Sequence, residues 1–508
     1  MPRPAAVLGT IALERDGAVS LQRQLYAALR EAILRGRLAP GTRLPATRLL
    51  ARDLGTARNT VVAAFEQLVA EGYLASRVGD GTRVAAVLPE TLLHARRARV
   101  TAAPQGVAPG LSRRGQAIVG ARRALRNPQR RAFQPGLPAL DEFPRDLWTR
   151  LLARRARRSP RATLGYGYPA GLPILREAIA WWFGAARGVT CTPEQVIVVA
   201  GAQAGLDLAC RLLLDAGDPA WIEEPGYLGA RGALLAAGAA PVPVPIDADG
   251  LDVDAGARAS PAARLVYVTP SHQFPLGMTM SLARRLRLLA WAAEAGAWVL
   301  EDDFDSEYRY AGRPVAAMQG LDAAGRVVYV GTFSKTMFPA LRAGYLVVPV
   351  TLVDAFTAAV RLTGHQVAGD VQAALADFLA EGHFAAHVRR MRSLYAARQD
   401  VLVGALRRRL GGLLAVEARE GGMQVAAMLP AGADDVGAAR AADAEGVVAP
   451  PLSMYHLGTA GRRGLHLGFA AVSEREIPAG VERLARGLER WHGAGGARAR
   501  AVVRSARS

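Results

Sequence analysis

The one lysine of the chain lies in a segment whose side chains could hold a phosphorylated aldehyde. Among 63 lysine and arginine residues, Lys335 is the single lysine, and arginine fills every other basic position. A primary amine condenses with an aldehyde, whereas a guanidinium stays protonated and does not react. Thr332, Ser334 and Arg342 flank Lys335 in VVYVGTFSKTMFPALRAGYL. Hydroxyls and a guanidinium bind a phosphate dianion, so the segment predicts groups for both ends of such a ligand.

Two further segments carry groups of matching chemistry. In AWVLEDDF, acids follow an apolar strand, and a carboxylate there can pair with a pyridinium nitrogen and keep it protonated. We assign Asp302 to this role, with Asp303 as the alternative. VVAGAQAGLDLACRLL predicts a strand, a glycine turn and a helix start. Amides at a helix N-terminus bind phosphate, so Ala202 and Gln203 are further candidates for the phosphate end.

The elements that must position these groups predict an α/β body over 133–490. Apolar runs such as QVIVVAG, RLVYVTP and RVVYVGT alternate with segments rich in alanine, leucine and arginine. Such runs are typical of strands in a parallel or mixed sheet that helices cover on both faces. Cys191 and Cys210 show no disulfide or metal spacing and indicate buried thiols in a reducing compartment. Glycine and proline interrupt the apolar runs, so we expect no membrane span and a cytoplasmic protein.

A different pattern occupies 14–88. Ser20 is a candidate cap for a helix that ends before Gly36, and two more helices are predicted over about 46–54 and 57–71. Two short strands, around a Gly79-Asp80-Gly81 turn, follow them. Three helices and a hairpin are the outline of a winged helix-turn-helix.

In such a domain the second helix of the motif enters the major groove of DNA with its first residues against base edges. Arginine can clamp guanine, and asparagine can clamp adenine. The hairpin, or wing, can reach the adjacent groove or backbone. The candidate DNA-contacting residues are Arg43, Arg48, Arg58, Asn59, Thr60 and Arg77.

Between the two patterns, 89–132 is predicted to be a linker. Residues 91–140 contain ten arginines and no acid, which is more than half of the net charge of +19. Such a charge suggests a polyanionic partner, most simply nucleic acid. The linker is either a solvated tether or an additional contact to phosphates. The last residues, 491–508, are expected to form a disordered tail.

Two resemblances sharpen these expectations. LYAALREAILRGRLAPGTRLPATRLLARDLGTARNTVVAAFEQLVAEGYLASRVGDGTRVA resembles the GntR family of regulators. That resemblance implies sequence-specific binding of double-stranded operator DNA as a dimer, with Arg48, Arg58, Asn59 and Thr60 as contacts. The lysine segment resembles fold-type-I aminotransferases. It implies that Lys335 forms an internal aldimine with pyridoxal 5'-phosphate, while Thr332, Ser334 and Arg342 hold the phosphate.

The same resemblance extends to two tyrosines. EEPGY puts Tyr227 where the family stacks an aromatic ring on the pyridine. GYGYPAG resembles the loop whose tyrosine reaches the phosphate of the neighbouring subunit, and Tyr166 matches that tyrosine. This implies an obligate dimer.

Together the halves resemble the MocR/GabR family, in which a GntR-type head is fused to an aminotransferase-like body. TPSHQFPLGMTMSLARR, EDDFDSEYRY, GTFSKTMFPALRAGYLVVP and ALADFLAEGHFAAHVRRMR match that family. The resemblance implies an α+β winged helix-turn-helix head and an α/β body of the fold-type-I, pyridoxal-phosphate-dependent type. It further implies a head-to-tail homodimer that regulates transcription and responds to a small-molecule effector.

The sequence departs from the family at two positions. Phe304 replaces a tyrosine that bonds the phenolic oxygen of the cofactor, and His272 or Gln273 could compensate. His466 aligns with the arginine that binds the substrate carboxylate, although Arg462 and Arg463 lie close by if the alignment shifts. Histidine binds a carboxylate more weakly and only when protonated. Among the small-molecule effectors that the resemblance allows, an ordinary amino acid is therefore less expected than pyridoxal phosphate itself or an unusual amine.

Two alternatives to a regulator remain open. One is a working aminotransferase with an accessory DNA-binding head, against which Phe304 and His466 argue. The other is a DNA-binding protein that has lost its cofactor, against which Lys335 and Arg342 argue. Residual transaminase activity is compatible with the regulator.

Overall fold

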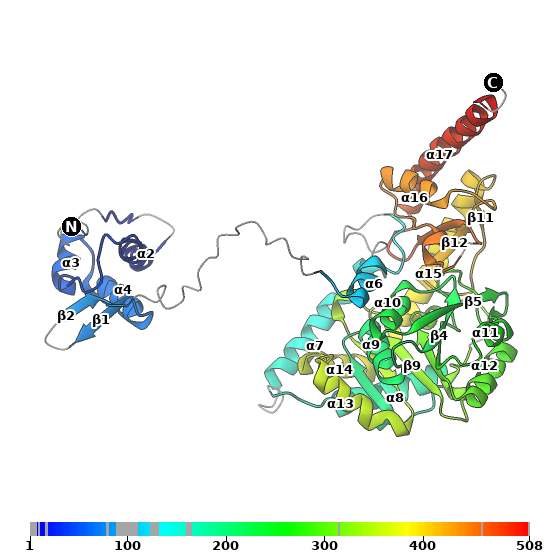
Figure 1. Ribbon diagram of the computed structural model, residues 1–508, viewed down its shortest axis with the longest axis horizontal. Coiled ribbons are helices and arrows are strands. Elements are labelled where there is room, and N and C mark those ends of the chain that lie inside the picture. Colours follow the sequence, from blue (N-terminus) through cyan, green and yellow to red (C-terminus); the bar gives the residue numbers. More distant parts are fainter. Residues whose placement is uncertain are drawn as a thin grey trace. The chain divides into compact units, whose positions relative to one another are not determined.

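The computed structural model describes residues 8, 11–15, 19–77, 81–87, 110–121, 132–158, 165–312, 315–458 and 461–505. The chain divides into two compact units, Met1–Gly110 and Leu111–Ser508 (Figure 1).

The first unit is a small helical domain with a hairpin. Its elements are α2 (Leu21–Leu34), α3 (Thr47–Asp53), α4 (Arg58–Ala70), β1 (Leu74–Arg77) and β2 (Gly81–Val84). The Ser20 hydroxyl accepts a hydrogen bond from the Arg23 amide and caps α2. β1 and β2 pair antiparallel, and Leu29, Phe65 and Leu68 belong to the common core. These elements confirm the predicted winged helix-turn-helix, although Gly79 and Asp80 of the predicted turn lie outside the described residues.

The second unit is built on a mixed sheet of eight strands in the order β3-β10-β9-β8-β7-β4-β5-β6. β9, β8, β7, β4 and β5 run parallel, whereas β10 runs antiparallel to both of its neighbours and β6 runs antiparallel to β5. The strands are β3 (Val196–Val199), β4 (Pro219–Glu224), β5 (Ala240–Asp247), β6 (Gly250–Leu251), β7 (Leu265–Val268), β8 (Trp298–Asp303), β9 (Val327–Thr332) and β10 (Gly344–Val347).

Helices cover both faces of this sheet, as predicted. One core joins α7, α8 and α14 to Val198 and Tyr345, and another joins α9, α10 and α13 to Ile197 and Leu346 from the opposite face. The helices are α7 (Arg145–Arg158), α8 (Pro173–Arg187), α9 (Ala202–Leu213), α10 (Leu228–Ala237), α11 (Val253–Ala259), α12 (Leu282–Ala295), α13 (Val353–Thr363) and α14 (Gly369–Ala380).

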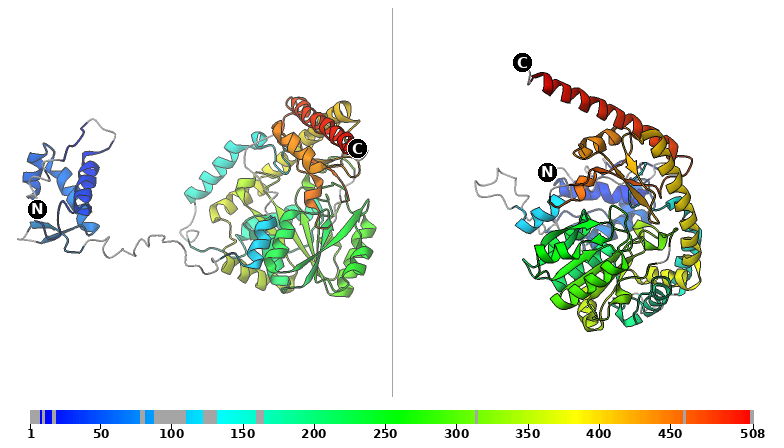
Figure 2. Two further views of the ribbon diagram at one scale, coloured as in Figure 1. Left: turned by 45° about the horizontal axis from the view of Figure 1, so that its top comes forward. Right: turned by 90° about the vertical axis from the view of Figure 1, so that its right-hand side faces the viewer.

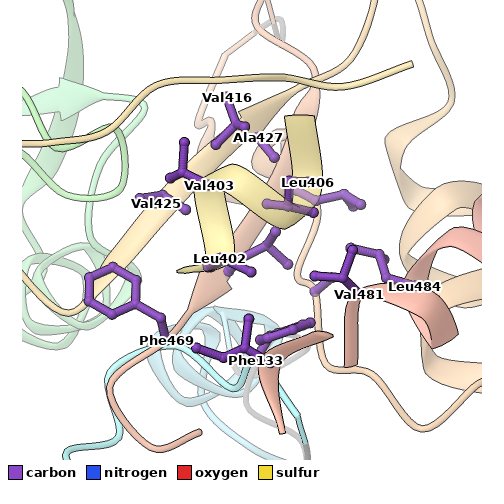
Figure 3. Packing of buried hydrophobic residues seen from close by; sticks show 14 of the residues in the cluster. Phe133, Leu402, Val403, Leu406, Val416, Val425, Ala427, Phe469, Val481 and Leu484 are labelled. Atoms are coloured by element: carbon purple, nitrogen blue, oxygen red, sulfur yellow. The ribbon is translucent and has the colours of Figure 1, made fainter. Parts of the chain in front are cut away.

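A smaller antiparallel sheet follows, with strands β11 (Ala415–Val416), β12 (Gln424–Met428) and β13 (Gly464–Gly468). It packs with α15 (His383–Leu410), α16 (Asp435–Ala444) and α17 (Ile477–Ser505). Figure 3 shows the core of this part, in which Leu402 of α15, Val425 of β12 and Phe469 lie together with Phe133. Through Phe133, the segment that begins the body is therefore anchored in the small sheet.

Two predicted boundaries look different in the structure. The range 89–132, which we expected to be a linker, contains α6 (Arg113–Ala121), which packs against α10. The range 491–508, which we expected to be a disordered tail, continues α17 as helix to Ser505, and Figure 2 shows this helix extending beyond the small sheet. Alanine and arginine have high helix propensity, which accounts for helix in both places. Residues 88–109, 122–131 and 506–508 lie outside the description.

Among the described residues, no helix combines the length and the apolar character needed to cross a membrane.

Candidate cofactor site and DNA-binding surface

Lys335 follows the end of β9 and points inward. Its Nζ donates a hydrogen bond to the Gly136 carbonyl at 2.7 Å, and a Cβ at Gly136 would lie 2.9 Å from Nζ. Burial lowers the pKa of the amine, while the carboxylates of Asp305 and Asp302 raise it in part. A lowered pKa favours the neutral amine, which is the form that attacks an aldehyde.

Asp302, near the end of β8, keeps one oxygen free. Its Oδ2 accepts a hydrogen bond from the Tyr267 hydroxyl at 2.7 Å, whereas its buried Oδ1 has no partner among the described residues. Burial raises the pKa of this carboxyl to about 7, although the Tyr267 hydrogen bond and Lys335 lower it. A buried acceptor without a donor is costly, so Oδ1 fits the N–H of a pyridinium ring.

Asp303, the alternative, has its Oδ2 engaged elsewhere, although its buried Oδ1 also lacks a partner among the described residues. Its Oδ2 accepts from the Arg187 Nε at 3.0 Å and from the Tyr329 hydroxyl at 2.7 Å. Successive side chains of a strand point to opposite faces, so the two carboxylates cannot share a site. The structure therefore favours Asp302 as the ring partner and gives Asp303 a structural ion pair.

The raised pKa of Asp302 predicts how pH affects the cofactor-free protein. The pKa of Asp302 is about 7 in the folded protein and 3.8 in its ordinary state. The folded state therefore holds the proton more tightly than the unfolded state, which stabilises the fold. This stabilisation is full below pH 3.8 and is lost as the pH rises to about 7. Asp302→Asn removes this dependence. We expect the wild type to lose free energy of unfolding between pH 3.8 and about 7, and the variant not to show this loss. In urea titrations, the variant should therefore become more stable relative to the wild type as the pH rises through this range. Parallel pH profiles would contradict the assignment.

The predicted phosphate-binding groups meet at one end of the sheet. Gly344 of β10 pairs with Thr332 of β9, and a Cβ at Gly344 would lie 2.9 Å from the amide nitrogen of Ala202. The Thr332 hydroxyl accepts from the Ser334 amide at 3.1 Å. Arg342 holds a left-handed backbone conformation, with φ of 50°, which is uncommon outside glycine and occurs at functional sites.

The first turn of α9 completes this end. Gly201, with φ of 90°, precedes Ala202 and Gln203 at the helix N-terminus. A Cβ at Gly201 would lie 4.0 Å from the carbonyl carbon of Arg342. The structure thus brings Ala202, Gln203, Thr332 and Arg342 into one neighbourhood, where helix amides and a guanidinium suit a dianion.

Tyr227 stands between the two ends of the site. It precedes the first residue of α10, and its hydroxyl lies 3.5 Å from Gln203 Oε1. Burial raises the pKa of its phenol to about 12, with a further increase from Asp302 and a decrease from Arg342. The ring therefore lies within electrostatic reach of both the predicted ring partner and the predicted phosphate ligand.

Of the two candidate substitutes for the missing tyrosine, Gln273 has its amide group engaged, whereas His272 keeps its buried Nε2 without a partner among the described residues. His272 Nδ1 pairs with the Asp305 carboxylate at 2.9 Å. Gln273 Nε2 donates to the Pro225 and Phe274 carbonyls at 2.9 and 2.6 Å. Phe304 packs edge-on against Phe274, with ring centroids 6.0 Å apart. The side chain of Phe304 thus packs against other aromatic rings.

His466, on β13, is fully buried. Its Nδ1 lies 3.0 Å from the Tyr455 hydroxyl, and burial lowers its pKa to about 3, so the ring is neutral at ordinary pH. The two nearby arginines have other partners: Arg462 donates to the Ile246 carbonyl at 3.4 Å, and Arg463 lies 3.5 Å from Asp435. None of His466, Arg462 and Arg463 therefore provides a free cation at the position that was predicted to bind the substrate carboxylate.

Some of the other residues of the site could be identified from the sequence, and others could not. Tyr166 is 95% exposed, as a residue would be if it served a neighbouring subunit. No sequence signal identified Gly136 as the acceptor for Lys335, because the two are far apart in the chain. Tyr267, the partner of Asp302, could have been found in the strand RLVYVTP, since it is a polar tip in a buried run.

In the first unit, Arg43, Arg48, Arg58 and Asn59 lie at or near the surface, and Thr60 is half-buried. Arg58 is the first residue of α4, and in the described structure no side chain caps this helix end. Exposed arginines at a helix N-terminus with free amides suit contact with phosphates and base edges. The backbone of Arg77 lies in β1, but its side chain is outside the description.

Comparison with known proteins agrees with both units. The family model "Aminotransferase class I and II" matches residues 142–484, and "Bacterial regulatory proteins, gntR family" matches residues 21–84. By fold and site the chain is thus a DNA-binding head joined to an aminotransferase-like body.

Relatives share both parts. The chain is 48% identical to "Probable rhizopine catabolism regulatory protein MocR" of Rhizobium meliloti, over 93% of this chain and 95% of that protein. It is 36% identical to "HTH-type transcriptional regulator TauR" of Rhodobacter capsulatus, over 94% and 98%. Among solved structures, LysN, an alpha-aminoadipate aminotransferase of Thermus thermophilus, superposes with a TM-score of 0.67 and 30% identity over 72% and 93%. That structure contains N-(5'-phosphopyridoxyl)-L-leucine.

The chain belongs to the MocR-type family of regulators, which join a gntR-type winged helix-turn-helix to an aminotransferase class I and II domain. The gntR-type head implies that the protein binds DNA.

Proposed function

We propose that the protein is a transcription regulator whose DNA binding depends on pyridoxal 5'-phosphate held at Lys335. The observation that carries this proposal is the buried amine of Lys335 within electrostatic reach of Asp302, whose Oδ1 has no partner among the described residues. When bound, the cofactor supplies an electrophilic carbonyl and an electron-accepting ring. Asp302 would hold the ring nitrogen, Tyr227 would cover one face, and Thr332, Ser334, Arg342 and the amides of α9 would hold the phosphate.

The working unit would be a homodimer, because Tyr166 is exposed in its own chain and matches a tyrosine that serves the neighbouring subunit in the family. Occupation of the pocket by a small-molecule effector would shift the equilibrium between two arrangements of the heads. A working aminotransferase is the second candidate, since the site retains Lys335, Asp302 and Arg342. The neutral His466 favours the regulator over an enzyme for ordinary amino acids.

The test is a titration of operator binding against the coenzyme. Operator DNA selected from a random pool is bound to the cofactor-free chain at fixed salt, and pyridoxal phosphate is added. We expect the affinity for operator DNA to change as coenzyme is added. The change should level off at the coenzyme concentration that occupies the site. An affinity that is independent of coenzyme, together with steady-state transamination near about 10 per second, would favour the aminotransferase.

Arg58→Ala tests the DNA-contacting surface separately. Arg58 begins α4 and is exposed, so its loss should cost about 1–3 kcal/mol of operator binding and relax selectivity at one base pair. Arg35→Ala is a control, because Arg35 is exposed at the C-terminal end of α2 and pairs with Glu31. Equal losses for both variants would show that the recognition helix is misplaced.

A further inference from the structure

A cavity of about 280 Å³ lies where loops of the large sheet meet the loop that leads into β12. Its walls come from the segments after β7 and β8, from the last residue of α8, and from residues 418–422. Lys335, Asp302 and Arg342 are not among the described residues that line it. The cavity is therefore separate from the site that we assign to the coenzyme.

Most of the charged groups in these walls are engaged with a partner. The side chain of Asp305 is 1% exposed, and its two oxygens lie 2.9 and 3.0 Å from His272 Nδ1, so it presents little charge to the cavity. Two ion pairs engage the other groups, and they are Arg187–Asp303 and Arg309–Glu420. A ligand that enters the cavity therefore meets these groups already balanced.

Arg419 is the cation of these walls that lacks a close partner. Among the described residues, its guanidinium has Glu417 at 3.6 Å, which is beyond the length of a hydrogen bond. Glu417 is 78% exposed, and an ion pair with so exposed a group contributes little. The Arg419 side chain is only 27% exposed, and a Cβ at Gly277 would lie 3.1 Å from its Cγ. Its stem is thus held in place while its donors remain available to an anion.

A hydroxyl and an apolar surface face the same space. Ser271 Oγ accepts a hydrogen bond from Arg187 Nη2 at 2.6 Å, which leaves the hydroxyl hydrogen for another acceptor. Met278, Val315 and Ala418 contribute carbon to the lining. A ligand that matches these walls has one anionic group, a hydroxyl that can accept a hydrogen bond, and a small apolar part.

We propose that this cavity binds a small hydroxycarboxylate, whose carboxylate pairs with Arg419 and whose hydroxyl meets Ser271. Such a ligand needs no amine, because it does not react at Lys335. The inference is independent of the proposed function, since the cavity has its own walls. The two sites are nevertheless close, because Asp305 in the cavity wall raises the pKa of Lys335.

L-Lactate and L-lactamide are a matched pair of probes. They have the same shape and the same hydroxyl, but lactamide has a neutral amide in place of the carboxylate, and neither carries an amine that condenses with the coenzyme. Each is titrated calorimetrically, at fixed salt, into the full-length protein loaded with pyridoxal phosphate. We expect L-lactate to bind at least about tenfold more tightly than L-lactamide, because a hydrogen bond between two charged groups is stronger than one to a neutral amide.

Arg419→Met makes the test specific. Methionine keeps the apolar stem but removes the charge, so the preference for L-lactate should disappear. The loop should keep its place, because the backbone of Arg419 is bonded in both directions to the Gln399 amide, at 2.9 and 3.0 Å. Arg475→Met is the matched control, since Arg475 is exposed and does not line the cavity. It should bind both probes as the wild type does.

Three results would overturn the proposal. They are absence of binding by the wild type at L-lactate concentrations up to about 10 mM, where even a Kd of about 1 mM gives near saturation, equal binding of the two probes, and a preference that survives in Arg419→Met. The first two are decided by the wild type alone, whether or not the variant folds.

Coenzyme absorbance and operator binding, recorded on the same preparation, separate this inference from the proposed function. A protein that holds coenzyme and responds to it on DNA, yet does not distinguish the two probes, contradicts this inference alone. A protein that prefers L-lactate but holds no coenzyme contradicts the proposed function alone.

Discussion

Lys335→Ala is expected to abolish covalent retention of the coenzyme. The wild type loaded with pyridoxal phosphate should show an absorbance band at about 400–430 nm that borohydride reduction fixes to the chain. Lys335 is the one lysine of the sequence, so no second ε-amine can replace it. The variant should show no reducible band, and its intact mass should stay unchanged after borohydride treatment.

Lys335→Arg is the matched control for charge. It retains a cation beside Asp302 and Asp305 but cannot condense with an aldehyde, so it should lose the band as completely as the alanine variant. Both variants should unfold in urea near the wild-type midpoint of the cofactor-free protein, since the amine makes one hydrogen bond, to Gly136. A reducible band that survives in Lys335→Ala would refute the assignment of the site.

Arg187→Met is expected to destabilise the body by about 3–5 kcal/mol, because it leaves Asp303 buried without its ion partner. Arg187 is almost fully buried, and its guanidinium contacts Asp303, Ser271 and the Val315 carbonyl. Although burial alone lowers the pKa of this guanidinium, Asp303 raises it overall. The pair thus joins the end of α8 to β8.

Arg211→Met is the control for that prediction. Arg211 pairs with Asp207 one helical turn away, and its side chain is 54% exposed, so its loss should change stability by no more than about 1 kcal/mol. All seven tryptophans lie between 148 and 491, so tryptophan fluorescence in urea follows the body without a signal from the head. If both variants lost the same free energy of unfolding, the prediction that the buried Arg187–Asp303 pair stabilises the body more than the exposed Arg211–Asp207 pair would be wrong.

Local signals account for the parts of the fold that the sequence predicted well. Ser20 marks the start of α2, and Gly36 follows its end. The alternation of apolar strands with helices predicted a sheet covered on both faces, which the structure confirms. These features depend on neighbours in the chain, so one sequence suffices to find them.

The rest depends on contacts between distant segments. The choice between Asp302 and Asp303 required knowing which face of β8 holds Lys335, and the partner of Lys335 is 199 positions away. The neutrality of His466 results from burial, which a sequence pattern does not give. Helix α6 was missed because its charge pattern predicted a tether, whereas its packing against α10 stabilises a helix there.

The lone ε-amine at Lys335 has a practical consequence for measuring occupancy. Reagents that acylate amines have one side-chain target in each polypeptide, and that target is the amine that contacts the Gly136 carbonyl. A bound coenzyme would mask it. The fraction of molecules acylated at this position, read by peptide mass spectrometry, would therefore report how many sites are empty, even in unfractionated lysate and without any optical signal.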